Sequence, residues 1–292
     1  MGLKVQVEWI GLRGVPGLQL TIQSRARLNN GLEMPYLGLG TWESPQGKPT
    51  RDTVKYAIDC GYRLIDTAKI YGNEKEVGEG VKSSGVPRDQ VFVTTKLWNS
   101  DHGYDPTIRA CDESLKRLGL DYIDLYLIHW PVSEKRAETW KAMSHLVKQG
   151  KCRSVGVSNY TIRHLRKLLE SSSLVPVVNQ VEFSPFLYQR DLLKFCEESK
   201  VQLEAYSPLT RGRRLDNVHV SRIATEHKKS PAQIVLRWAI QHAVIAIPKS
   251  IRKERIQENS ELFDFNLSAE EMKILDSLNE DFRTCWDPSD IS

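Results

Sequence analysis

Short apolar runs rich in β-branched residues recur along the chain. Eight of these runs have the length of buried strands. They are Tyr36–Gly40, Tyr62–Ile65, Val91–Thr95, Tyr122–Ile128, Ser154–Val157, Val177–Val181, Val201–Ala205 and Val244–Ile247. The pattern therefore predicts eight β-strands.

The segments between these runs repeat apolar residues at helical spacing. They predict helices at Thr53–Cys60, Glu74–Ser83, Thr107–Leu118, Ala137–Lys148, Ile162–Glu170, Arg190–Glu198, Val218–Lys228, Ala232–Gln241 and Arg252–Glu261. Ser268 and Glu271 have the spacing of a capping box that opens one more helix. Strands that alternate with helices imply βαβ units and a parallel sheet. Eight such repeats fit an α/β fold of the (β/α)8 TIM-barrel type.

A doubly wound sheet is the alternative architecture. No G-x-G-x-x-G segment follows any of the predicted strands, which argues against a Rossmann-type dinucleotide-binding unit. Asn30-Gly31, between Leu28 and Leu32, predicts an N-terminal β-hairpin, which we expect to close the bottom of the barrel.

The chain shows no low-complexity linker, so we expect a single barrel domain over residues 25–292. Residues 1–24 form an N-terminal extension to which we assign no role, although Val5–Ile10 has the pattern of a strand. Asp281–Ser292 has no periodicity and is expected to form a tail.

The composition of the 292 residues is 40% hydrophobic and 27% charged, which excludes a fully disordered, collagen-like or coiled-coil chain. The 41 basic and 37 acidic residues nearly balance, so charge gives no argument for a nucleic-acid partner. No apolar run approaches the roughly 20 residues that span a bilayer. The odd count of 5 cysteines, without a C-x-x-C motif, favours reduced thiols and a cytoplasmic protein. The first 17 residues lack the apolar core of a secretory signal.

Polar residues end seven of the eight predicted strands. In chain order they are Asp66, Lys96, His129, Asn159, Gln180, Tyr206 and Lys249. In an eight-stranded barrel the carboxyl ends of the strands converge on one face, where the active site lies. Each residue alone has an ordinary structural explanation, as a helix cap, a packing residue, a rim charge or a core histidine. Seven together at one barrel mouth predict an active site.

At these residues the chain resembles the aldo-keto reductases, over roughly Ser24–Asn279. The matching stretches are Met34–Trp42, Gly61–Ala68, Tyr71–Glu74, Thr95–Trp98, Asp121–Pro131, Gly156–Asn159 and Ile247–Asn259. The resemblance implies an NADPH-dependent reductase of aldehydes and ketones, built on a TIM barrel and acting through an Asp-Tyr-Lys-His tetrad. In this sequence the tetrad corresponds to Asp66, Tyr71, Lys96 and His129.

The chemistry of these side chains agrees with carbonyl reduction, which needs a hydride at carbon and a proton at oxygen. A phenol has a pKa of about 10, which makes it a slow acid at neutral pH. We expect Lys96, held by Asp66, to lower the pKa of Tyr71 and make it the general acid. A neutral His129 would donate a hydrogen bond to the substrate oxygen and orient it.

The resemblance also assigns the cofactor site. Ser158, Asn159 and Gln180 would hold the nicotinamide carboxamide, and Tyr206 would stack on the ring. Lys249, Ser250 and Arg255 match the family's 2′-phosphate site, which favours NADPH over NADH. The other residues implied in cofactor binding are Gly40, Thr41, Asp66, Ser207, Leu209, Glu258 and Asn259.

Trp42, Trp98 and Trp130 are expected to line the mouth together with His129 and to suit an apolar or aromatic carbonyl compound. Only Pro131–Arg136 separates Trp130 from the next helix, and this short loop predicts an open site of broad specificity, as in prokaryotic and protist-like members. Trp286 in the tail is a further candidate contact. We also hypothesise that Arg211 or Arg213 adds to pyrophosphate binding.

Two other classes of function are open at this stage. Some proteins of this fold are regulatory subunits that bind NADPH with little turnover, and a structural role is also conceivable. The intact tetrad favours the enzyme. We expect a monomer that uses no metal and has no nucleic-acid or membrane partner.

Overall fold

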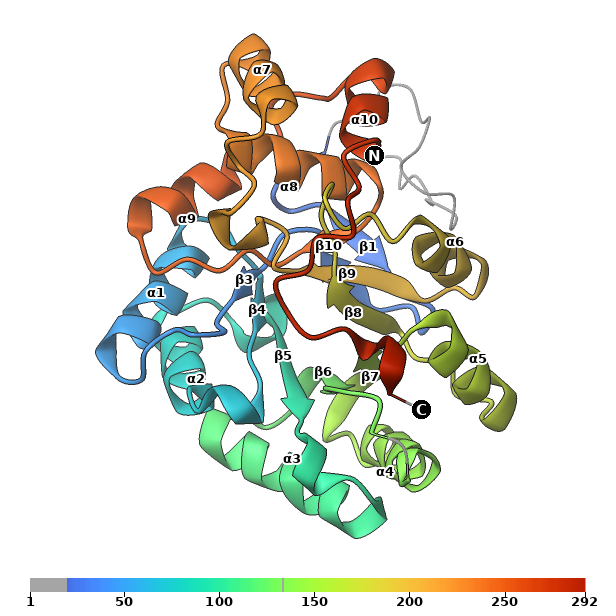
Figure 1. Ribbon diagram of the computed structural model, residues 1–292. Helices are drawn as coiled ribbons and strands as arrows, with labels where there is room; N and C mark the ends of the chain where they lie inside the picture. Colours follow the sequence, from blue (N-terminus) through green and yellow to red (C-terminus); the bar gives the residue numbers. More distant parts are fainter. Residues whose placement is uncertain (1–19, 133, 292) are drawn as a thin grey trace, which may run out of the picture.

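The computed structural model describes residues 20–132 and 134–291 (Figure 1). The predictions made for residues 1–19, including the possible strand Val5–Ile10, lie outside the described residues.

The predicted barrel is confirmed. Eight parallel strands follow one another around the sheet in the order of the sequence. They are β3 (Leu39–Gly40), β4 (Leu64–Asp66), β5 (Phe92–Leu97), β6 (Ile123–Ile128), β7 (Cys152–Ser158), β8 (Val178–Glu182), β9 (Gln202–Tyr206) and β10 (Ile245–Ala246). Parallel bridges Leu37↔Ala246 and Gly40↔Lys249 join the first strand to the last and close the barrel.

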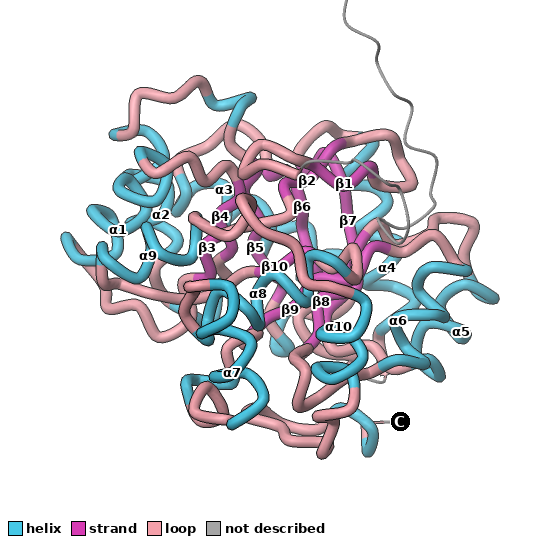
Figure 2. Tube along the Cα trace, turned by 90° about the horizontal axis from the view of Figure 1, so that it is seen from above, coloured by secondary structure: helices cyan, strands magenta, loops and turns pink. Residues whose placement is uncertain are grey.

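The helices surround the strands, as Figures 1 and 2 show from two directions. They are α1 (Lys48–Asp59), α2 (Glu74–Ser83), α3 (Tyr104–Leu118), α4 (Arg136–Lys148), α5 (Ile162–Ser171), α6 (Arg190–Glu198), α7 (Val218–His227), α8 (Pro231–Gln241), α9 (Lys253–Ser260) and α10 (Ala269–Asp276). All the predicted helices are present. The largest difference is at α1, which begins five residues before the predicted Thr53, because Pro49 is tolerated in the first turn, where its missing N–H has no partner to lose. The capping box of Ser268 and Glu271 is also confirmed.

The N-terminal hairpin pairs β1 (Arg25–Arg27) with β2 (Glu33–Pro35). Its turn includes Gly31 at φ 86°, a conformation that favours glycine. The Asn29 side chain donates to the carbonyls of Pro176 and Lys200, which precede β8 and β9. The hairpin therefore covers the amino-terminal end of the barrel, as expected (Figure 2).

The C-terminal segment crosses the other end of the barrel, from α10 to the first turn of α5 (Figure 1). Phe186 carbonyl accepts from the backbone amides of Glu280 and Phe282. At the far end, the ring of His164 on α5 lies 2.7 Å from the carbonyl of Ile291. The predicted tail is thus held along its length. In the part of the chain described here, no helix is long and apolar enough to cross a membrane.

Candidate active site

A cavity of about 1250 Å³ opens where the carboxyl ends of the strands meet. Loops that follow the strands line much of its wall, and residues of α8 and α9 add to it. The C-terminal segment contributes Arg283, Thr284, Cys285 and Trp286. This is the face on which (β/α)8 barrels carry their active sites.

Three members of the predicted tetrad are joined at the base of this cavity by the ammonium of Lys96. Its Nζ lies 2.6 and 2.8 Å from the two carboxylate oxygens of Asp66. It also lies 2.9 Å from the carbonyl of Thr67 and 3.3 Å from the hydroxyl of Tyr71. Lys96 is wholly buried, so these contacts replace its water. The fully paired ammonium is fixed beside the phenol.

The position of Tyr71 follows from the chain that leaves β4. Ala68 is extended, and Lys69–Tyr71 then forms a single 3-10 turn, η1, which ends at Gly72 with φ 68°. Lys69 forms a 2.6 Å ion pair with Asp101, in the loop after β5. The turn returns Tyr71 over the end of its own strand, toward Lys96.

The expectation that Lys96 lowers the pKa of Tyr71 is wrong for the site as it stands. Burial, reinforced by the negative charge of Asp66, raises the pKa of Tyr71 well above its usual value. The physical reason is that Asp66 neutralises the ammonium by direct contact, so the phenol faces an ion pair rather than a free cation. Tyr71 consequently keeps its proton throughout the neutral range.

His129 completes the group. Its ring centroid is 5.7 Å from that of Tyr71 and 5.3 Å from that of Trp98. Burial, and then the charge of Lys96, lowers the pKa of His129 well below its usual value. The imidazole is therefore neutral at physiological pH, as expected. Its buried Nδ1 has no hydrogen-bond partner among the described residues.

Polar groups from β7, β8 and β9 line one wall. The hydroxyl of Tyr206 lies 2.8 Å from Asn159 Oδ1, and Asn159 Nδ2 donates to the carbonyl of His129. Asn159 has φ 63°, a left-handed conformation that asparagine tolerates better than most residues. Gln180 Nε2 donates to Asp66 Oδ2 at 2.8 Å. These bonds place two amides and a phenol ring side by side.

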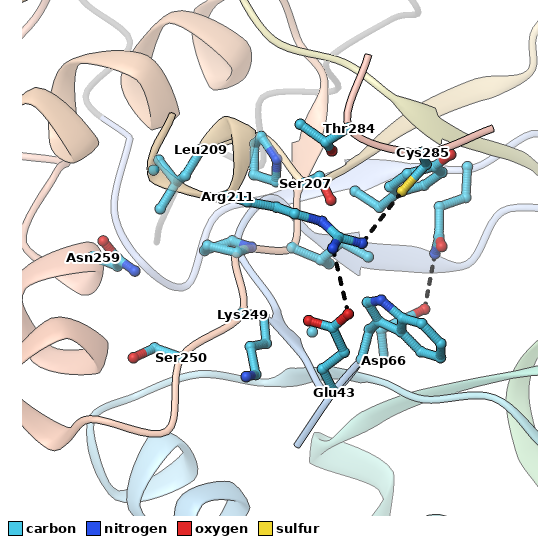
Figure 3. A pocket seen from close by; sticks show the side chains of 18 of the residues that line it. Glu43, Asp66, Ser207, Leu209, Arg211, Lys249, Ser250, Asn259, Thr284 and Cys285 are labelled. Carbon is cyan, nitrogen blue, oxygen red and sulfur yellow. Dashed lines mark hydrogen bonds and ion pairs between the residues drawn. The ribbon is translucent and has the colours of Figure 1, made fainter. Parts of the chain in front are cut away.

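Basic residues gather at the other end of the cavity, where the chain leaves β10 and enters α9. Lys249, Ser250 and Arg255 all line it, and Figure 3 shows Lys249 and Ser250 beside each other there. Among residues 20–132 and 134–291, neither Lys249 nor Arg255 has an acidic partner within ion-pair distance. Two unpaired cations at the start of a helix suit a phosphate.

Most residues assigned by resemblance do line the cavity. The cofactor candidates that line it are Gly40, Asp66, Asn159, Gln180, Tyr206, Ser207, Leu209, Lys249, Ser250, Arg255, Glu258 and Asn259, and the substrate candidates are Trp42, Trp98, His129 and Trp130. Thr41 and Ser158 are buried behind the wall, where their hydroxyls donate to the carbonyls of Asp66 and Gln180.

A sequence model of the Aldo/keto reductase family matches residues 36–280. The chain belongs to the aldo-keto reductase family. Glyoxal reductase of Bacillus subtilis is 49% identical over 93% of this chain and 98% of its own length. The 9,11-endoperoxide prostaglandin H2 reductase of Trypanosoma cruzi is 50% identical over 90% of this chain and 94% of its own. A solved aldo-keto reductase of Bombyx mori, in complex with NADP, superposes with a TM-score of 0.84 at 38% identity, covering 90% and 95% of the two chains.

Aldo-keto reductases use a nicotinamide cofactor, and the residues present fit one. Both hydrogens of Gln180 Nε2 are used inside the barrel, which leaves its amide oxygen for a ligand in the cavity. Tyr206 supplies an aromatic face in the same wall, and the unpaired Lys249 and Arg255 supply positive charge at the far end. An aromatic amide joined to phosphates matches this distribution of groups.

One side chain of this aldo-keto reductase spans the cavity. Arg211 was singled out from the sequence, but its partner was not predicted. Arg211 reaches across the cavity to Glu43, 3.4 Å away in the loop after β3, and its other nitrogen lies 3.8 Å from Cys285 Sγ (Figure 3). Arg213 is not among the residues that line the cavity. Arg214 turns away and pairs with Glu280 at 2.5 Å.

The residue that anchors the tail was not predicted from the sequence. Glu182, at the end of β8, is 3% exposed, and its carboxylate accepts hydrogen bonds from Thr284 and Cys285. This contact brings Trp286 to the rim, where its ring lies 5.8 Å from that of Trp130. The position of this acidic residue at the end of a buried strand could have identified it from the sequence.

Proposed function

We propose that this protein reduces aldehydes and ketones to alcohols with NADPH, through residues 25–292 as one catalytic domain. The observation that carries the proposal is the bonding of Lys96 to both Asp66 and Tyr71 at the base of a cavity that His129 also lines. A protonated phenol and a neutral imidazole are then the donors nearest to a bound carbonyl oxygen.

The proposed reaction uses these groups in one sequence. When bound, NADPH supplies a hydride to the carbonyl carbon. Tyr71 gives its hydroxyl proton to the carbonyl oxygen, so the product is a neutral alcohol and the residue is left as a phenolate. Lys96, 3.3 Å from that oxygen, stabilises the phenolate until a proton from solvent restores it. His129 donates a hydrogen bond that orients the substrate and stabilises the developing charge.

Specificity for NADPH rests on Lys249 and Arg255. Both line the cavity without an acidic partner in the described chain, so an additional phosphate gains two charge-assisted contacts there. NADH lacks that phosphate and leaves the cations unsatisfied. We therefore propose tighter binding of NADPH than of NADH.

We also propose that Arg211 closes over the cofactor pyrophosphate. Its guanidinium already spans the cavity toward Glu43, and of the three arginines in segment 211–214 it is the one that lines the cavity. An Arg211→Ala variant should bind NADPH more weakly than wild type, with a smaller dependence on ionic strength. Arg213→Ala is the matched control and should bind as wild type does. Equal affinity in the two variants would contradict this role.

The substrate is expected to be an apolar or aromatic carbonyl compound in an open site. Trp42, Trp98 and Trp130 form an aromatic wall beside His129, and Trp42 is 41% exposed at the entrance. The two relatives are named for glyoxal and for a prostaglandin endoperoxide, which differ greatly in size. Broad specificity, from small dicarbonyls to larger apolar molecules, agrees with both.

The test is consumption of NADPH, and separately of NADH, with methylglyoxal, a nitrobenzaldehyde and a keto-sugar. We expect turnover of at least one substrate, faster with NADPH, and its loss in Tyr71→Phe. Binding of NADPH without turnover on any of these would favour the regulatory alternative. Turnover that prefers NADH would contradict the assigned phosphate site.

A further inference from the structure

A second carboxylate lies inside the barrel, directly behind the residues that line the cavity. Glu204 on β9 is completely buried, and its Cα is the direct partner of Gln180 on β8. Gln180 Nε2 donates to Glu204 Oε2 at 2.9 Å and to Asp66 Oδ2 at 2.8 Å. Glu204 is therefore joined through one amide to the Asp66–Lys96 ion pair, although Glu204 is not itself among the residues that line the cavity.

The two carboxylates fix the orientation of the Gln180 amide. An NH2 group has two hydrogens, and here each hydrogen is given to a different carboxylate. Turning the amide oxygen inward would give up both of these hydrogen bonds and place the oxygen against the Asp66 carboxylate. Its oxygen is thereby left toward the cavity, where a ligand that donates a hydrogen bond can use it.

We propose that Glu204 is a positioning residue for the cofactor, which holds the Gln180 amide so that its oxygen accepts a hydrogen bond from the nicotinamide carboxamide. This role rests on the proposed function. Without Glu204, the Gln180 amide loses one of its two anchors and rotates about its last bond. The ordered acceptor is then lost, and the cofactor binds more weakly.

Glu204 also carries a charge that depends on pH. Its Oε1 has no partner among the described residues. Burial and the nearby Asp66 raise the pKa of Glu204 to about 8, against smaller opposing effects of Gln180 and Lys96. The titratable groups that interact electrostatically with Glu204 are Asp66 on β4, Lys96 on β5 and Tyr71 in η1. The neighbouring strand β10 places Ile245, which does not titrate, opposite Glu204.

The charge has a consequence for the two forms of the cofactor. Below about pH 8 the interior holds a balanced Asp66–Lys96 pair, and above it Glu204 adds one negative charge. A negative charge behind the nicotinamide site favours the cationic ring of NADP+ over the neutral ring of NADPH. The ratio of the dissociation constants of NADPH and NADP+ should therefore rise with pH. The ribose phosphate is common to both forms, so its own titration cancels in the ratio.

The test measures the equilibrium binding of NADPH and NADP+ to wild type and three variants. Binding is monitored by the quenching of protein fluorescence, in the absence of substrate. Glu204→Gln keeps an acceptor for Gln180 but cannot ionise. Glu204→Leu removes the acceptor. Leu203→Val changes packing on the same strand, on the face away from Gln180, and controls for general disturbance. Thermal unfolding establishes that each variant is folded.

We expect Glu204→Leu to bind NADPH about tenfold more weakly than wild type, as the loss of one hydrogen bond predicts, with Glu204→Gln and Leu203→Val close to wild type. The NADPH-to-NADP+ ratio should rise several-fold between about pH 6.5 and about pH 9 in wild type and stay flat in Glu204→Gln. If Glu204→Leu does not fold, Glu204→Met, which also removes the acceptor but keeps the length of the side chain, takes its place in the affinity comparison.

Wild-type affinity in Glu204→Leu, or equal losses in the Gln and Leu variants, would overturn the positioning role. A ratio that rises equally in wild type and Glu204→Gln would overturn the charge coupling. In either case wild type still binds NADPH, so the proposed function stands. A wild-type protein that binds neither form of the cofactor overturns the proposed function and this role together.

Discussion

The carboxylate of Glu182 accepts hydrogen bonds from both the backbone amide and the hydroxyl of Thr284, at 2.6 and 2.5 Å, across 102 residues of sequence. Its second oxygen accepts from the amide of Cys285 at 3.1 Å. A buried carboxylate with three donors is a strong anchor, because removing it leaves two half-buried amides and a hydroxyl to find other partners. One barrel residue thus fixes the wall that carries Trp286.

Replacing this anchor should loosen the tail without disturbing the cofactor site. In Glu182→Leu we expect faster cleavage by trypsin after Arg283 and a higher KM for aromatic carbonyl substrates. The Kd for NADPH should stay close to the wild-type value, because neither Glu182 nor the tail that it holds is among the residues assigned to the cofactor. Limited proteolysis with peptide mapping, together with binding and kinetics, checks this. Glu198→Gln, on the exposed side of α6, is the control. Unchanged cleavage would mean that Glu182 does not hold the tail.

Trp286 should contribute to aromatic substrates selectively. Its side chain is 75% exposed and lies beside Trp130, which leaves its outer face open to a substrate ring. An aromatic pair is worth about 0.5–1.5 kcal/mol beyond burial, so Trp286→Ala should raise KM for a nitrobenzaldehyde by roughly two- to tenfold. Methylglyoxal, which has no ring, is the internal control. Equal changes for both substrates would contradict a specific contact.

The strands, the helices and the tetrad were all predicted from sequence. The helices and strands could be predicted because periodicity and capping depend on residues that are close together in sequence. The polar residues that end the strands meet because a closed barrel brings the carboxyl ends of all its strands to one face. Asp66, Lys96 and His129 each follow a predicted strand, so their convergence required only the fold class. Tyr71 came from the resemblance alone, since its place depends on a single turn.

The contacts that the sequence did not reveal join segments far apart in the chain. Glu182 meets Thr284, and Arg211 meets Glu43, only because the tail and two loops cross the same mouth. The five cysteines are free, as predicted, yet Cys111 and Cys152 lie with their sulfurs 3.6 Å apart. The direction of the pKa shift of Tyr71 also escaped prediction, because it is set by the sum of several buried charges.

Glu204 should make stability depend on pH. Its pKa is about 8 in the folded protein and about 4.3 in an unfolded chain, so between these values the folded state binds one more proton. The free energy of unfolding then falls as pH rises through this window, by about 1.4 kcal/mol per pH unit for this group. Glu204→Gln lacks the effect, so its stability relative to wild type should increase with pH up to about 8 and then level off.

Urea unfolding of both proteins at several pH values measures this difference, with Glu198→Gln as a control for an exposed carboxylate. If the free energies of unfolding of Glu204→Gln and wild type changed with pH in parallel, a raised pKa at Glu204 would be contradicted.

His129 should not titrate in the neutral range. Burial and Lys96 lower its pKa well below the usual value, so it stays neutral and able to donate as pH falls through about 6.5. The rate constant kcat for reduction should therefore show no inflection there, and His129→Gln should lose activity by a similar factor at each pH. Steady-state rates from about pH 5.5 to about pH 8 check this. An inflection near 6.5 that disappears in His129→Gln would contradict it.

A single-turnover experiment decides whether Tyr71 gives the proton that completes carbonyl reduction. Wild type and Tyr71→Phe are loaded with NADPH, mixed with excess nitrobenzaldehyde, and followed by loss of nicotinamide fluorescence. We expect Tyr71→Phe to bind NADPH as wild type does but to transfer hydride at least about 100-fold more slowly. Hydride transfer at the wild-type rate in a folded Tyr71→Phe protein would contradict it.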